Sequence, residues 1–206
     1  MVDSTEQLES LERWSHRLFI LAGVFLLVAA SNRGIAFFLE NVAFNDWIGL
    51  AGLFGRLAAL LGTGGLALQI EKRTVRLGKL NRTIASLAVV FTTGLLTLAI
   101  LENVGVTTPI IAVFGIGTLV LSFVTFSLFG VSIIRTGAHS TLIGSLLLIV
   151  ALLLLVVFIG QTVVPEGLIG TVIEGLLFVL YLTIGYRLQV EKVPSRRTES
   201  VADATP

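Results

Sequence analysis

Long apolar stretches alternate with short polar breaks along the whole chain. Six of these stretches approach or exceed the roughly 18 to 20 residues that an α-helix needs to cross a lipid bilayer. They cover about residues 17–39, 47–70, 84–102, 109–134, 142–163 and 167–188. We therefore predict an all-α fold, a polytopic membrane bundle of six transmembrane helices arranged as three helical hairpins.

The two ends of the chain differ from this pattern. The stretch STEQ at 4–7 has the spacing of a capping box, so a short amphipathic helix is expected within residues 1–16, lying at the membrane surface. Residues 193–206 contain proline and polar side chains without periodicity, which predicts a disordered tail. The six-helix transmembrane domain then occupies residues 17–192.

Basic residues are confined to alternate breaks. Of the 14 lysine and arginine residues, 12 lie near or before the start of the first apolar stretch, near or after the end of the last one, or in the second and fourth breaks. The positive-inside rule places those breaks and both termini in the cytoplasm, which predicts a multi-pass protein of a prokaryotic cytoplasmic membrane. Five cations in the break 71–83 are expected to contact lipid headgroups. They are Lys72, Arg73, Arg76, Lys79 and Arg82.

Composition agrees with a membrane location. Of the 206 residues, 55% are apolar and 13% are charged, whereas a soluble domain carries about 25% charged residues. The mean hydropathy is +0.97. The chain contains no cysteine, which excludes disulfides, thiol catalysis and thiolate metal sites.

Short stretches recur along the chain. LENVAF at 39–44 returns as LENVGV at 101–106, and LQIEK at 68–72 returns as LQVEK at 188–192. The intervals of 62 and 120 residues favour three hairpins derived from one ancestral unit.

The three-hairpin architecture resembles HdeD-like small membrane proteins. The segment SIIRTGAHSTLIGSLLLIVALLLL, with VPEGLIG and LTIGYRL after it, is similar to a pattern in uncharacterised six-helix prokaryotic membrane proteins. The first resemblance implies a link to acid-stress resistance. Neither resemblance carries functional residues over to this chain.

Three charges lie far inside predicted spans. Counted at 1.5 Å per residue from the cytoplasmic ends, Arg56, Glu174 and Arg33 stand roughly 20, 22 and 24 Å up. All three therefore share the outer third of a hydrocarbon core about 30 Å thick. Arg33 is close enough to the outer surface to reach it with its side chain, but Arg56 is not.

We therefore expect Glu174 to be the counter-ion of Arg56, because an unpaired charge at this depth costs about 3 kcal/mol. Glu40 and Glu102, at the outer turns, are the competing partners of Arg56. Small residues recur every four positions on the second span, and small and polar residues flank Glu174 on the sixth. This pattern predicts that the second and sixth spans are close neighbours.

Two functions follow from this arrangement. In the first, a polar site in the outer half serves a small transporter, channel or sensor, through residues Arg33, Arg56, Glu174, Gln161 and Tyr181. In the alternative, the protein is a structural or accessory membrane protein whose interior charges only fix helix packing.

Other classes of function lack their motifs. We predict no enzyme, no metal site and no cofactor, because neither a zinc-protease motif nor a nucleophile elbow nor a phosphate-binding glycine loop is present. Nucleic acid is not an expected partner, since the basic break has no aromatic residues for base stacking. Membrane lipids are the expected partners, together with a second copy of the chain or another membrane protein.

Overall fold

Six long helices make up almost all of the protein. The computed structural model describes the backbone of residues 4–39, 46–160 and 166–202, and the side chains of residues 13–39, 46–159 and 170–191. The helices are α1 (Ser4–Phe38), α2 (Asp46–Arg73), α3 (Val75–Asn103), α4 (Ile111–Thr136), α5 (Thr141–Gly160) and α6 (Glu166–Ala202). The described residues contain no strand.

Each helix contains a segment long and apolar enough to cross a membrane, between 19 and 29 residues in length. Each segment overlaps one of the six predicted stretches, and the third, Val75–Asn103, begins before the predicted start at residue 84. The prediction of an all-α, six-helix architecture is confirmed, and it indicates a multi-pass membrane protein.

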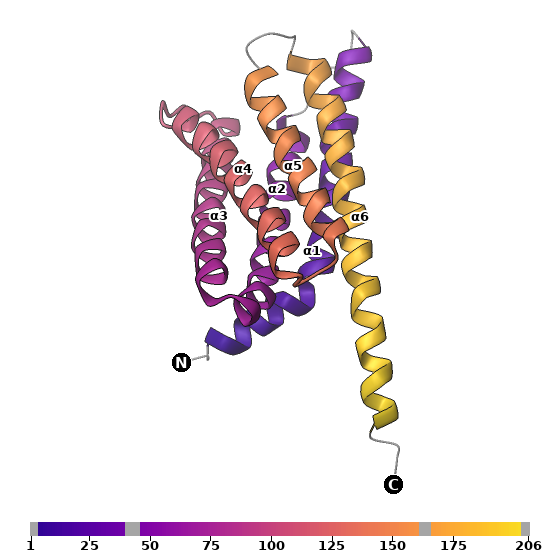
Figure 1. Cartoon of the computed structure of the whole chain (residues 1–206). Helices are drawn as coiled ribbons and strands as arrows, with labels where there is room; N and C mark the ends of the chain where they lie inside the picture. Colours follow the sequence, from indigo (N-terminus) through magenta and orange to yellow (C-terminus); the bar gives the residue numbers. More distant parts are fainter. Residues whose placement is uncertain (1–3, 40–45, 161–165, 203–206) are drawn as a thin grey trace.

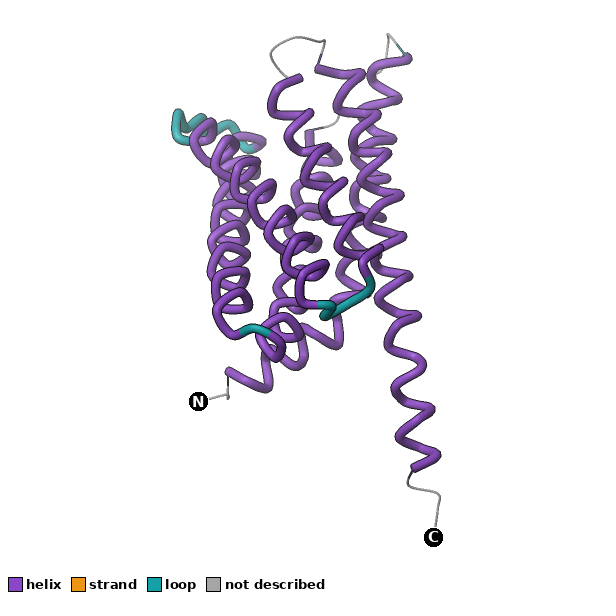
Figure 2. The backbone as a smooth tube through the Cα atoms, viewed as in Figure 1, coloured by secondary structure: helices purple, strands orange, loops and turns teal. Residues whose placement is uncertain are grey.

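The helices run alternately up and down (Figures 1 and 2). One end of the bundle, which we call the distal end, carries the connections α1–α2, α3–α4 and α5–α6. The opposite, proximal end carries the other two connections and both chain termini. Each helix packs against the next one in sequence, and α1 also packs against α6, which closes the ring. The α3–α4 hairpin leans away from the α5–α6 hairpin toward the distal end (Figure 1).

Helix α1 lies between α2 and α6 and has its most extensive contacts with these two helices. Glycines make both contacts close. A methyl group at Gly55 of α2 would lie 3.0 Å from the carbonyl oxygen of Ala22, and one at Gly185 of α6 would lie 2.8 Å from that of His16. The predicted close packing of the second span on the sixth is therefore wrong. The small residues of both helices serve contacts with α1 instead.

Helices α4 and α5 cross near the proximal end through a reciprocal glycine contact. A methyl group at Gly130 would lie 2.8 Å from the carbonyl oxygen of Gly144, and one at Gly144 would lie 2.9 Å from that of Gly130. The turn that follows α4 uses Gly137 in the left-handed conformation, with φ 63°, and its N–H donates to the Ile133 carbonyl.

The basic break 71–83 is helical rather than a loop. Only Thr74, in an extended conformation, separates α2 from α3. Lysine, arginine and leucine are good helix formers, so both helices continue through the polar residues. Gly78 touches the backbone of Glu71, a contact that leaves no room for a side chain. Arg82 forms an ion pair with Glu71 at 3.4 Å across the turn.

Both ends of the chain are more helical than predicted. Helix α1 begins at Ser4, where the capping-box spacing begins, but it continues into the first span without a break at residue 16. Helix α6 extends to Ala202, so the predicted disorder of residues 193–206 does not hold for residues 193–202. Extending an existing helix gains one hydrogen bond per added residue and avoids the cost of nucleation. Residues 203–206 lie outside the described residues.

Candidate functional site

The interior charges come together in the distal half of the bundle, on three different helices. Arg33 lies near the distal end of α1, Arg56 lies on α2, and Glu174 lies on α6. Glu174 is buried, with only 7% of its side chain exposed, whereas Arg33 keeps 34% of its side chain exposed. A carboxylate this deep in an apolar bundle requires a charged partner or hydrogen-bond donors.

Glu174 receives that partner from α1. The Nη2 atom of Arg33 donates to Oε1 of Glu174 at 3.2 Å. The guanidinium passes over Gly170, one helical turn before Glu174, where a methyl group would lie 2.7 Å from Nη1. The expected Arg56–Glu174 pair is therefore corrected: Arg33 is the directly bonded counter-ion. Arg33 is the partner because α1 packs beside α6 in the bundle, whereas α2 does not.

Arg56 approaches the same carboxylate without bonding to it. It lies close enough to act electrostatically on Glu174 and on Tyr181. Its Nε atom is buried and has no hydrogen-bond partner among the described residues, and the same holds for Oε2 of Glu174. Among the described residues, two guanidinium groups, those of Arg33 and Arg56, therefore act on the carboxylate of Glu174.

Tyr181 lies beneath these charges in the hydrophobic core. Its side chain is fully buried, and its ring lies 5.9 Å from that of Phe19 on α1 and 6.0 Å from that of Phe126 on α4. These contacts pack the core below the charged group and limit how far a polar space can extend toward the proximal end.

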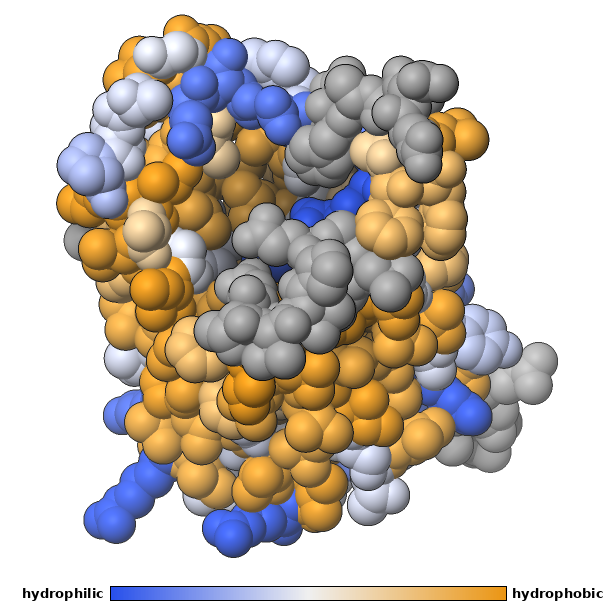
Figure 3. All heavy atoms as spheres, turned by 90° about the horizontal axis from the view of Figure 1, so that it is seen from above, coloured by the Kyte–Doolittle hydropathy of each residue, from blue (hydrophilic) through white to orange (hydrophobic). Residues whose placement is uncertain are grey.

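A polar cleft opens above the charges at the distal end. Its volume is about 480 Å³, and it lies between α1, α2 and α3. Figure 3 shows this end of the bundle from above, hollowed and with hydrophilic residues near the hollow. The residues that line the cleft are Arg33, Asp46, Gly49, Leu50, Ala99, Glu102 and Asn103.

The other predicted site residues divide into three groups. Glu102 lines the cleft near the end of α3. Glu40 and Gln161 lie outside the described residues. The five basic residues predicted to contact headgroups lie at the proximal end, on the last turn of α2 and the first turns of α3, and all but Arg82 are exposed. Their contact with lipid stays a prediction.

Asp46 and Asn103 are cleft residues that the sequence did not single out as a site. Asp46 is the first residue of α2 and Asn103 the last of α3. A signal was present, because acidic and amide residues cluster in the distal connections and these contain no lysine or arginine. The sequence does not show that the start of α2 lies beside the end of α3.

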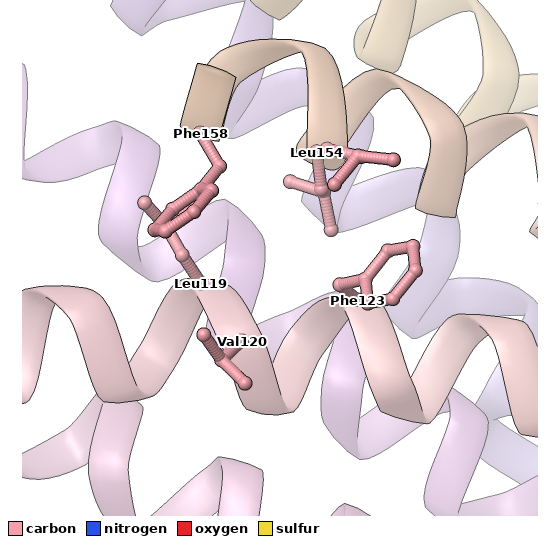
Figure 4. Close-up of a pocket in the computed structure, with 6 residues that line it drawn as sticks. Leu119, Val120, Phe123, Leu154 and Phe158 are labelled. Atoms are coloured by element: carbon pink, nitrogen blue, oxygen red, sulfur yellow. The ribbon is translucent and has the colours of Figure 1, made fainter. Parts of the chain in front are cut away.

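A second pocket lies between α4 and α5 and is almost entirely apolar. Its volume is about 120 Å³. Figure 4 shows its side chains pointing toward one another from the two helices, with Phe123 and Phe158 at its two ends. Nothing in its lining can hold a charge, so it suits a hydrocarbon group.

At the proximal end, His139 and Glu191 connect the α4–α5 turn to α6. Their Nδ1 and Oε2 atoms are 3.1 Å apart. Within the described ranges, no three histidine, aspartate or glutamate residues are close enough to hold a metal ion. Comparison with family models, with curated proteins and with solved structures finds no match for this chain.

Proposed function

We propose that this protein is a small transporter that takes up a polar solute into the distal cleft, with the Arg33–Glu174 pair as the floor of the binding site. One observation carries the proposal: the cleft of about 480 Å³ ends on a charged residue of a buried ion pair. This volume is typical of small-molecule sites. Charged residues inside membrane spans are rare and often mark the pathway of a solute or ion.

The proposal includes an orientation. With 12 of 14 cations on proximal segments, the proximal end faces the cytoplasm of a prokaryotic cell and the cleft opens to the outside. The resemblance to HdeD-like proteins stays a prediction, because no family model matches the chain.

A structural role is the second candidate. It is favoured by the direct 3.2 Å contact between Arg33 and Glu174, which would fix α1 against α6 even if no solute ever reached it. The two functions differ in whether water enters the cleft.

The orientation can be tested with single cysteines, because the chain has none of its own. Val106→Cys in the distal α3–α4 connection should react with a membrane-impermeant maleimide in intact cells. Val75→Cys at the proximal start of α3 should react only after permeabilisation. Both native side chains are exposed, so access to the reagent is the variable. The opposite result would invert the topology.

The cleft can be tested in the same way. Ala99→Cys should react from outside, because Ala99 lines the cleft and a thiol reacts as its thiolate where water reaches it. Thr97→Cys is the matched control and should resist labelling. Thr97 lies on the same helix and its native side chain is exposed, but it does not line the cleft. If both variants resist labelling, the cleft is dry and the structural role replaces the transporter.

A further inference from the structure

The apolar pocket between α4 and α5 follows from the way these two helices cross. They touch at Gly130 and Gly144 near the proximal end and separate toward the distal end (Figure 1). On α4 the pocket begins at Phe123, seven residues distal of Gly130, and on α5 it reaches Phe158, fourteen residues distal of Gly144. The space of about 120 Å³ therefore lies roughly 10 to 20 Å beyond the crossing, between helices that have moved apart.

The lining of this pocket suits hydrocarbon and nothing polar. All of the lining residues are leucine, valine or phenylalanine (Figure 4). An engineered protein cavity of about 150 Å³ lined by leucine, isoleucine and phenylalanine stays dry and binds benzene. If each carbon is given the roughly 30 Å³ that a water molecule occupies in the liquid, the pocket holds about four carbons of a chain. It therefore suits a short section of an acyl chain.

The pocket lies in the part of the bundle that a membrane would surround. Both of its walls belong to membrane-spanning segments, Ile111–Thr136 on α4 and Thr141–Ile159 on α5. Counted from the distal ends of these helices, the lining residues lie roughly 3 to 18 Å deep. Half of a hydrocarbon core is about 15 Å thick, so the pocket belongs mainly to the distal leaflet.

The surface beside the pocket favours lipid over a second copy of the chain. Apolar side chains that are between 45% and 60% exposed flank it on both helices, namely Val113, Ile116, Val120, Leu152 and Val156. All five are large and branched, whereas contacts between membrane helices are enriched in small residues. A helix with its side chains is also about 10 Å wide and cannot enter a space of this volume.

The charge at the distal end selects the headgroup. The connections that follow α3 and α5, residues 104–110 and 161–165, contain no lysine or arginine. Glu102 on α3 and Glu166 on α6 flank these connections. An anionic headgroup or the carboxylate of a fatty acid would therefore meet like charge without a counter-ion, whereas an ammonium group would be attracted.

We propose that the pocket between α4 and α5 binds an acyl chain of a zwitterionic phospholipid from the distal leaflet. The chain enters from the side, between the exposed residues of the two helices, and fills the space that their separation leaves. The headgroup then lies at the level of the distal connections. This site is separate from the polar cleft and does not depend on the proposed function.

The test counts the lipid molecules that the full chain retains in detergent, by native mass spectrometry. The protein is incubated with equal amounts of phosphatidylethanolamine and phosphatidylglycerol that carry the same acyl chains, and free lipid is then removed. We expect about one phosphatidylethanolamine per chain, and at least about fivefold less phosphatidylglycerol, because the anionic headgroup finds no cation at the distal connections.

Filling the pocket should displace the lipid. Leu155→Phe on α5 and Leu119→Phe on α4 enlarge the lining from opposite walls, so one variant serves if the other does not fold. Each should lower the retention of phosphatidylethanolamine at least about fivefold, because the added ring occupies the space of the chain. Leu152→Phe is the matched control. Leu152 lies on α5 and is 58% exposed, but it does not line the pocket, so this variant should retain lipid like the unmodified protein.

Four results would overturn the proposal. Equal retention of the two lipids would remove the zwitterionic headgroup, and unchanged retention in both filled variants would place the lipid elsewhere. A chain that retains no lipid would have an empty pocket. A dimer that dissociates only in the filled variants would show that a second copy covers the pocket instead.

Discussion

The Glu174→Gln variant should lose about 3 kcal/mol of unfolding free energy in detergent. Removing one partner of a buried ion pair costs roughly 3 to 5 kcal/mol, because the remaining charge stays desolvated and unpaired. The lower end applies here, since Arg33 keeps 34% of its side chain exposed and part of its charge remains solvated. Arg56 adds to the loss, because it also acts on Glu174. Denaturant unfolding monitored by circular dichroism measures the change.

A double-mutant cycle separates the two arginines. Arg33→Gln combined with Glu174→Gln should lose clearly less than the two single variants summed, because the double variant leaves neither charge of the bonded pair behind. The same cycle with Arg56→Gln should give a smaller coupling energy, since no hydrogen bond joins Arg56 to Glu174. A larger coupling for Arg56 would contradict the 3.2 Å contact with Arg33.

Glu71→Gln is the matched control for this experiment. Its partner Arg82 is 41% exposed and the ion pair lies at the proximal turn, so the loss should stay below about 1 kcal/mol. A loss as large as that of Glu174→Gln would mean that the effect reports charge removal in general rather than the buried pair.

The number and positions of the spans could be predicted from the sequence because hydropathy acts residue by residue and the bilayer sets the length. The depth of Arg33, Arg56 and Glu174 followed from the same counting. The ends of the elements were harder to place. Lysine and arginine at 72–82 are polar enough to suggest a loop and also good helix formers, and the helix prevailed.

The order of the helices around the bundle could not be predicted from hydropathy and depth. Depth brings three charges to one height but does not say which helices are neighbours. Small-residue stripes on the second and sixth spans predicted that these two spans pack on each other, but both pack on α1 instead. Gly170 shows the missing information: the guanidinium of Arg33 lies against it, and this contact depends on α1 being the neighbour of α6.

The same packing gives the second large effect, at Gly185 of α6. A methyl group there would lie 2.8 Å from the carbonyl oxygen of His16, 3.1 Å from the backbone nitrogen of Ile20 and 2.7 Å from its Cγ1 atom. Two of these atoms belong to the backbone of α1, so a change of side-chain rotamer cannot relieve the clash. The helices must move apart, and they carry the two residues of the bonded pair, Arg33 and Glu174.

Gly185→Ala should therefore lower the unfolding free energy by about 2 kcal/mol, within the range for overpacking a close contact. Gly175→Ala, on the same helix, is its control: no atom lies within 4 Å of the added methyl group, so the better helix propensity of alanine should leave stability unchanged or raise it by up to about 1 kcal/mol. In the Gly185→Ala background the Arg33–Glu174 coupling energy should also fall, because α1 no longer holds its register on α6. If both alanine variants behave alike, α1 and α6 do not meet at Gly185, and the bonded pair that depends on their contact loses its support.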